Sequence, residues 1–474
     1  YFRGLGFDKL NVSPILAAVN MRLPDFNALD FSKCVKGKDS SGKTINICTL
    51  TEFMPFDNAM YAPYDPNDAY SQQMNMIFGV DQDAIMFGLG ARINYAYDAD
   101  VIYHEFTHAV IGTVTNNAMI NADDWGLVVE PGAVNEGMAD YFSSTITNDS
   151  KTGNYARHAT SSNSITMSPD AIRDVGEKIS CPQDMWGEFH RDGGVISHAA
   201  WLARQMYMDH FKTADTFEFD RSLYDSMAVW GQVPYYADVV EAFVAAMSNN
   251  PKIGSEFAEK SREAFAVTNA GDCPRFHKLA KGEKKPLFFV PAFGGGISWP
   301  SYFQFAYDVP ADAAGMKVVF TARDTSGKAH GGISLQMRSG QNVSYEWTAD
   351  GYNVTSDTEV FPDENGEYIL TAPDLKPGTT YYMVPTNSGD EAVIYNLNVV
   401  IEINPTEVDG GTPDGSVDQD ASADSGTADP DASTDDAAIV DAGDPDASPD
   451  AGVADGAVVP EFKTTGCSCS TVAL

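Results

Sequence analysis

The sequence predicts a multidomain α+β protein. Its 474 residues are too many for one ordinary hydrophobic core, so two or three folded units are expected. Residues 1–285 combine short strand-like pieces with strong helical periodicity, whereas from residue 286 the apolar residues recur at every second position. After residue 405 the composition changes again, to Asp, Ala, Gly and Pro. These changes divide the chain into two folded units and a spacer.

Helices are expected to dominate the second half of the first unit. Apolar residues at helical spacing mark segments 195–211, 235–247 and 256–267. Pro234 and Pro251 lie between these segments and mark their boundaries. The first unit is therefore mixed near its beginning and mainly helical near its end.

An all-β sandwich is predicted for residues 286–404. Alternation of apolar and polar residues is clear around 303–307, 333–337 and 393–401. Regular turn signals, such as those at 363–366 and 376–378, separate the expected strands, as in an antiparallel sandwich.

An acidic spacer is expected at residues 405–466. The chain has 67 acidic and 30 basic residues, and fourteen Asp and two Glu but no Lys or Arg lie between residues 405 and 461. Such a segment has almost nothing apolar to bury, so we expect it to be disordered. The overall negative charge repels phosphate backbones and anionic lipids, which argues against nucleic-acid partners. No apolar run is long enough to insert into a membrane.

The six cysteines leave several pairings open. Cys34 and Cys48 flank a turn-like stretch and are candidates for a loop disulfide, with reduced buried thiols as the equal alternative. A short tail, 467–474, carries Cys467 and Cys469, which resemble the start of a bacterial surface-sorting tail or are simply unpaired. Tyr1 begins no signal peptide, so we expect an export signal upstream.

Two histidines at helical spacing are the main chemical signal. His104 and His108 enclose Glu105 in an apolar stretch, and a spacing of four places both imidazoles on one helix face. There, two ring nitrogens can bind one metal ion. A buried helix with two satisfied histidines is the alternative, but this five-residue pattern is rare by chance in a chain with only 8 His.

A downstream carboxylate can complete the set. Glu136 lies in a second helical stretch and is the candidate third ligand. Two His and one Glu leave a fourth tetrahedral position open for water, as in catalytic rather than structural zinc sites. Asp140, one turn further along, is expected to accept the second N–H of His104.

These two motifs together resemble the thermolysin-like zinc metallopeptidases. The similar stretches are His-Glu-Phe-Thr-His at 104–108 and Asn-Glu-Gly-Met-Ala-Asp at 135–140. The resemblance implies a secreted or surface-attached endopeptidase that binds zinc and acts on proteins or peptides, with Glu105 as the general base. A monomer is expected. The β-unit is similar to the sandwich modules that follow secreted bacterial peptidases.

The same resemblance suggests further residues. His190, just before a helix of small residues, would stabilise the oxyanion, and His198 is its rival. Arg173 would bind a substrate carbonyl, although an ordinary surface arginine is nearly as good an interpretation. Asn58 and Ala59 would lie on an edge strand that pairs with the substrate main chain.

The sequence also departs from the family pattern. No tyrosine occurs between Tyr103 and Tyr141, so the family's second oxyanion partner is absent. The carboxylate expected five residues before His190 is Met185, and Asp184 or Glu188 are the substitutes.

A calcium site is a second metal expectation. Asp100 matches a family calcium ligand, but Thr147 replaces the glutamate that should share the ion. This mismatch puts the geometry of a Ca²⁺ site in doubt.

Two other functions remain as alternatives. An aminopeptidase would need a Gly-x-Met-Glu-Asn stretch, which the chain lacks. A catalytically impaired, peptidase-like surface binding or adhesion protein would fit the missing tyrosine together with the sandwich and the spacer.

Overall fold

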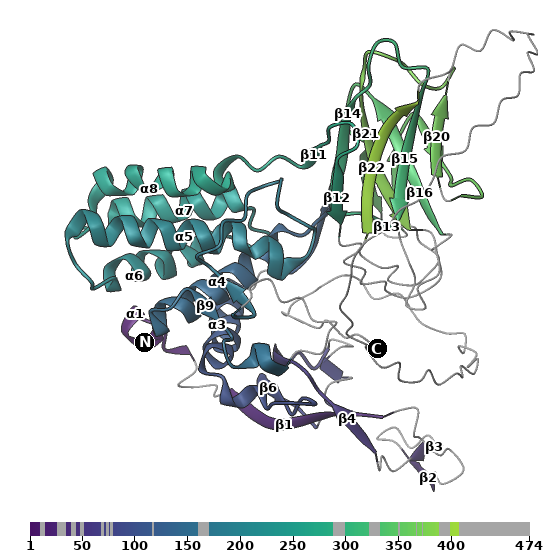
Figure 1. Cartoon of the computed structure of the whole chain (residues 1–474). Coiled ribbons are helices and arrows are strands. Elements are labelled where there is room, and N and C mark those ends of the chain that lie inside the picture. The colour runs from purple at the N-terminus through teal and green to yellow at the C-terminus, as the bar shows by residue number, and fades with distance from the viewer. Residues whose placement is uncertain are drawn as a thin grey trace, which may run out of the picture.

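The computed structural model confirms the mixed, multidomain α+β architecture (Figure 1). It describes residues 1–9, 15–25, 35–38, 44–47, 52–67, 71–72, 75, 79–115, 118–159, 170–287, 299–321, 332–348, 351–365, 367–371, 373–387 and 399–406. The proposed Cys34–Cys48 pair, nearly all of the acidic spacer and the cysteine tail lie outside these ranges.

A small mixed sheet forms the N-terminal part. Its strands have the order β4-β1-β6-β5, in which β1 runs parallel to β6 and the other pairs are antiparallel. The strands are β1 (Leu16–Pro24), β4 (Phe53–Pro55), β5 (Ala59–Ala62) and β6 (Ala84–Gly88). Two-stranded ribbons accompany it, namely β2–β3 (Val35–Lys38, Thr44–Ile47), β7–β8 (Asn121–Asp123, Gly126–Val128) and β9–β10 (Lys151–Thr152, Arg173–Asp174).

The helices gather into one lobe beside this sheet (Figure 1). They are α1 (Phe2–Leu5), α3 (Ala99–Thr115), α4 (Glu130–Thr147), α5 (Phe189–Phe211), α6 (Phe217–Ser226), α7 (Tyr236–Asn249) and α8 (Gly254–Thr268). The last two and α5 coincide with the three helical segments expected from periodicity. Helix α4 is buried along almost its whole length, so it is the central helix of the lobe. No helix within the described ranges is long and apolar enough to cross a membrane.

The β-sandwich packs two sheets face to face (Figure 1). One sheet has the order β11-β14-β21-β16-β19, with β13 also on β21, and the other has the order β12-β22-β15-β20. Their strands are β11 (Phe276–Lys278), β12 (Lys284–Leu287), β13 (Trp299–Pro300), β14 (Gln304–Asp308), β15 (Gly315–Thr321), β16 (Ile333–Ser339), β19 (Thr358–Val360), β20 (Glu367–Thr371), β21 (Thr380–Asn387) and β22 (Val399–Thr406). Strand β17 (Ser344–Thr348) pairs antiparallel with β18 (Gly351–Thr355).

The sandwich begins earlier than residue 286. Strand β11 already pairs with β14, and it does so in parallel, unlike the antiparallel pairs of the rest of the sandwich. Strand β22 runs to Thr406, so the first residues assigned to the spacer belong to a strand. One apolar cluster continues from the helical lobe into the sandwich, because Phe189 and Tyr302 belong to it and their ring centroids lie 6.3 Å apart.

A disulfide joins Cys181 to Cys273, with 5.4 Å between their Cα atoms. The sequence did not predict this pair, because the two residues are 92 positions apart. The bridge connects the segment before α5 to the short stretch between α8 and β11.

Candidate metal centre

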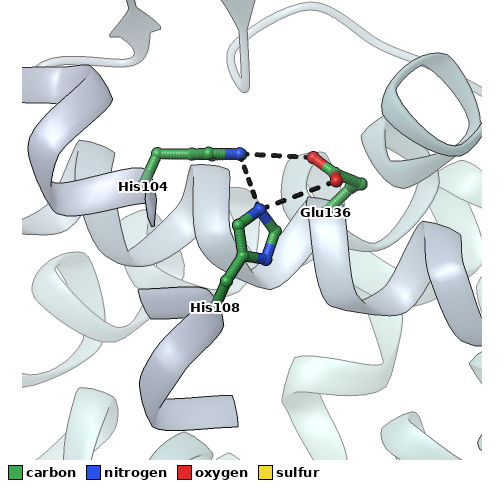
Figure 2. Close-up of side chains that lie close together, drawn as sticks. All are labelled: His104, His108 and Glu136. Atoms are coloured by element: carbon green, nitrogen blue, oxygen red, sulfur yellow. Dashed lines mark hydrogen bonds and ion pairs between the residues drawn. The ribbon is translucent and has the colours of Figure 1, made fainter. Parts of the chain in front are cut away.

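Helix α3 presents the two histidines on one face. The helix begins after Asp98, whose side chain accepts a hydrogen bond from the backbone N–H of Asp100 at 3.0 Å. His104 and His108 are both buried, and their Nε2 atoms lie 2.9 Å apart (Figure 2). The spacing of four residues therefore produces the expected convergence.

Glu136 reaches the same point from helix α4 (Figure 2). Its Oε2 lies 3.3 Å from Nε2 of His104 and its Oε1 lies 3.6 Å from Nε2 of His108. The three ligand atoms lie within 4.8 Å of one another, and in the described part of the chain this is the one group of three or more such side chains that could hold a metal ion.

The second nitrogens of the histidines show that the group suits a cation. Nδ1 of His104 lies 2.9 Å from Oδ1 of Asp140, and Nδ1 of His108 lies 2.5 Å from Oδ1 of Asn135. Each Nδ1 can donate its proton to an oxygen, and in a singly protonated ring this leaves a lone pair on Nε2. In that form two lone pairs and a carboxylate face one point, which suits a bound cation. The expected contact of Asp140 is thus present, whereas the role of Asn135 was not predicted.

The charge states of His108 and Glu136 suit metal binding, whereas His104 would have to release a proton to bind a metal ion. Burial lowers the pKa of His108 to about 4, which keeps this ring neutral at neutral pH. Burial would also lower the pKa of His104, but Asp140 and Glu136 raise it to about 9. Burial would raise the pKa of Glu136, yet His190 and His108 hold it well below its usual value, so its carboxylate is ionised.

A close crossing of two helices brings His190 to the site. A Cβ atom on Gly137 of α4 would lie 2.3 Å from the carbonyl oxygen of Gly193 of α5, and one on Gly193 would lie 2.8 Å from the nitrogen of Gly137. Only glycine permits this approach of two backbones. It places Nε2 of His190 3.4 Å from Oε2 of Glu136.

Glu188 is the carboxylate partner of His190. Nδ1 of His190 lies 2.6 Å from Oε1 of Glu188, and the other oxygen of Glu188 caps helix α5 by accepting the N–H of Arg191 at 2.8 Å. Asp184 instead accepts the N–H of Ser180. Met185 is fully buried in the apolar core. The structure thus selects Glu188 from the two substitutes.

His198 has a packing role. It is buried within α5, and its Nδ1 donates to the carbonyl oxygen of Val175 at 2.8 Å. Burial lowers the pKa of this ring. The geometry therefore favours His190 over His198 as the histidine at the metal centre.

Arg173 belongs to the site and is not an ordinary surface arginine. Its side chain is only 14% exposed, and its Nε and Nη2 donate to the two oxygens of Asp140 at 2.6 and 2.8 Å. Burial would raise the pKa of Asp140, but Arg173 and His104 hold it at about 2. Asp140 therefore orients both His104 and Arg173. The sequence does not indicate the contact between Asp140 and Arg173.

Glu105 is buried next to His104, His108 and Glu136, which together are called the metal group. Burial raises its pKa to about 7, against the lowering effect of His104. A backbone hydrogen bond from Tyr61 of strand β5 also reaches this carboxylate, while its Oε2 has no hydrogen-bond partner. A carboxyl group with a pKa near neutrality can both accept and release a proton.

Strand β5 lies at the edge of its sheet. Among the described strands it pairs with β6 alone, and it packs on α3 through a cluster that contains Ala59, Tyr61 and Ala109. The side chain of Asn58 accepts the N–H of Ala59 at 2.9 Å. Both expected substrate-binding positions are therefore at the beginning of an edge strand beside the helix of the metal group.

Both residues of the calcium expectation make hydrogen bonds to protein atoms. Oδ2 of Asp100 accepts the N–H of Gly153 at 3.2 Å, and Oγ1 of Thr147 donates to the carbonyl oxygen of its own helix at Ser143. Burial and the charge of Asp98 raise the pKa of Asp100 to about 6. The calcium expectation remains a prediction.

Comparisons with known proteins do not assign a family to the chain. No protein-family model and no curated protein matches the chain.

Proposed function

We propose that this chain is a secreted zinc-dependent endopeptidase of the thermolysin-like kind. The observation that carries the proposal is the convergence of two imidazole nitrogens and one carboxylate, with the buried Glu105 directly beside them. Zinc suits such nitrogen and oxygen ligands, and catalytic zinc sites commonly have three protein ligands and one open position.

The residues around the site can carry out peptide hydrolysis. Zinc bound by His104, His108 and Glu136 would lower the pKa of the attacking water and polarise the substrate carbonyl. Glu105 would take a proton from the attacking water and pass it to the departing amine, for which its pKa of about 7 is suitable. His190 donates an N–H to the oxyanion that forms on the substrate.

Glu188 prepares His190 for this role. Burial would lower the pKa of His190, but Glu136 and Glu188 raise it, which favours the protonated ring. Its Nδ1 is held by Glu188 and its Nε2 points toward Glu136. A fixed donor stabilises the oxyanion more than a mobile one, because its orientation is already established before the reaction.

Peptides are the substrates that the edge strand suits. An extended peptide can add to β5 by main-chain hydrogen bonds, with Asn58 and Ala59 at the point of contact. Arg173, fixed by Asp140, is the candidate donor to a substrate carbonyl.

Export from the cytosol is supported by one feature. The Cys181–Cys273 disulfide is of the kind that persists in oxidising compartments.

Replacing Glu105 with Gln tests the mechanism. We expect kcat on casein to fall by about 10²–10⁴, since a general base contributes roughly that much. Bound zinc should stay near about one equivalent per chain, because Glu105 is not a ligand. The matched control is Glu256→Gln on the exposed face of α8, which should retain full activity. Casein cleavage at the full rate by Glu105→Gln would show that Glu105 is not the base.

Zinc content separates the enzyme from the binding-protein alternative. After loading, a zinc content under about half an equivalent per chain would favour the peptidase-like binding protein. Loss of cleavage on chelation and its return with zinc would favour the enzyme.

A further inference from the structure

A buried lysine of the sandwich holds the segment that leads to His190. Lys285 lies in strand β12 and is 5% exposed. Its Nζ donates to the carbonyl oxygen of Pro182 at 3.4 Å and to that of Gln183. Because β12 is paired with β22, the position of this ammonium group is set by the sheet. A strand of the sandwich thus fixes two main-chain oxygens of the helical lobe.

The fixed segment continues directly to Glu188. Its backbone N–H groups at Trp186 and Gly187 donate to the carboxylate of Asp192 at 2.7 and 2.8 Å. Glu188 follows at once and accepts the Nδ1 proton of His190. A shift at Gln183 would therefore move Glu188 through a few hydrogen-bonded residues.

Other contacts hold the beginning of this segment. Cys181 is bonded to Cys273, its N–H donates to the carbonyl oxygen of Thr268 at 2.8 Å, and its carbonyl oxygen accepts from Asn269 at 3.2 Å. At the next two residues Lys285 holds both carbonyl oxygens, and that of Pro182 also accepts the N–H of Met185 at 3.2 Å.

Stability alone explains this lysine poorly. Burial lowers the pKa of Lys285 to about 8, against the raising effect of Asp192 and Asp184, so the ammonium group is still mostly charged at neutral pH. A buried charge is costly, and well-packed apolar residues commonly replace one without loss of stability. The two oxygens that it holds are a more specific reason for its presence.

We propose that Lys285 is a positioning residue, which holds the Pro182–Gln183 carbonyls so that Glu188 presents His190 to the reacting carbonyl group. This inference rests on the proposed peptidase function. It makes the sandwich a support of the catalytic site, whereas a separable substrate-docking module would leave the cleavage of small peptides unaffected.

The test compares Lys285→Met with Lys284→Met in the full chain. Lys284 is the exposed neighbour on the same strand, so both changes remove one charge. On a soluble chromogenic peptide we expect Lys285→Met to lower kcat about tenfold with KM almost unchanged, since oxyanion donors act mainly in the transition state. Lys284→Met should match the wild-type chain, and zinc content should be equal in all three.

A second background separates positioning from general damage. In a His190→Ala chain, Lys285→Met should lower kcat no further, because the group that it positions is gone. An equal fall in both backgrounds, or an unchanged kcat in the wild-type background, would overturn the inference. If Lys285→Met does not fold, Lys285→Gln keeps one donor group and is measured in the same two backgrounds. A wild-type chain that cleaves no peptide would overturn the proposed function and this inference together, whereas Lys285→Met with the wild-type kcat would overturn the inference alone.

Discussion

The pair of helices α3 and α4 and the segment 173–190 build two halves of one site in different ways. The helices satisfy their own backbone and bury His104, His108 and Glu136 in a continuous apolar core. The segment is irregular and depends on a disulfide, on Lys285 and on the carboxylate of Asp192. The group that could hold a metal ion is thus positioned by two helices, and the groups proposed to face the substrate are positioned by long-range contacts. The two functions should fail separately.

Removing the disulfide should have the largest effect, and it should act on the half of the site built by segment 173–190. Replacing Cys181 and Cys273 with Ser is expected to lower the free energy of unfolding by about 2–4 kcal/mol, because the bridge closes a long loop. Chemical denaturation measures this loss. Zinc content should be unchanged, since the helices hold the metal group without the bridge. Loss of zinc in the folded double variant would contradict the proposed separation.

Asp140→Asn should affect the half of the site built by helices α3 and α4. Asp140 accepts the Nδ1 proton of His104, and loss of such a partner commonly costs about 10–100-fold in metal affinity. Competition with a chelator measures the change. The control is Asp170→Asn, an exposed carboxylate paired with Lys151, which should bind zinc as the wild type does. Equal affinities in the two variants would show that Asp140 does not orient the ligand.

Glu188→Gln should give the smallest change in activity, and it tests whether the two halves of the site act independently. The amide can still accept a hydrogen bond from His190 but no longer supports its positive charge, so we expect kcat to fall about tenfold. KM and zinc affinity should stay near the wild-type values. A fall in zinc affinity of the same size would mean that the two halves are not independent.

Local periodicity explains why the metal group could be predicted. The spacing of His104 and His108 and the helical context of Glu136 depend on a few neighbouring residues, and the structure brings all three together. The same holds for helices α5, α7 and α8 and for the alternating strands β14 and β16. In these elements each side chain's direction follows from its position along the chain.

Long-range contacts could not be predicted in the same way. Glu188 could not be chosen from its neighbours, because the segment before α5 has no regular period. A lysine in a strand normally indicates a solvent-exposed position, so nothing in the sequence marks Lys285 as buried. The pairing of Cys181 with Cys273 and the parallel pairing of β11 with β14 join residues whose separation along the chain carries no local signal.

The place of strand β22 limits how the protein can be shortened. It lies between β12 and β15, so the last described strand of the chain is an inner strand of its sheet. A protein ended before residue 399 would lose both ladders and expose two unpaired edges, which promote aggregation. It would also leave β12, and with it Lys285, without the partner that holds it. A truncated protein for crystallisation should therefore keep every residue to Thr406.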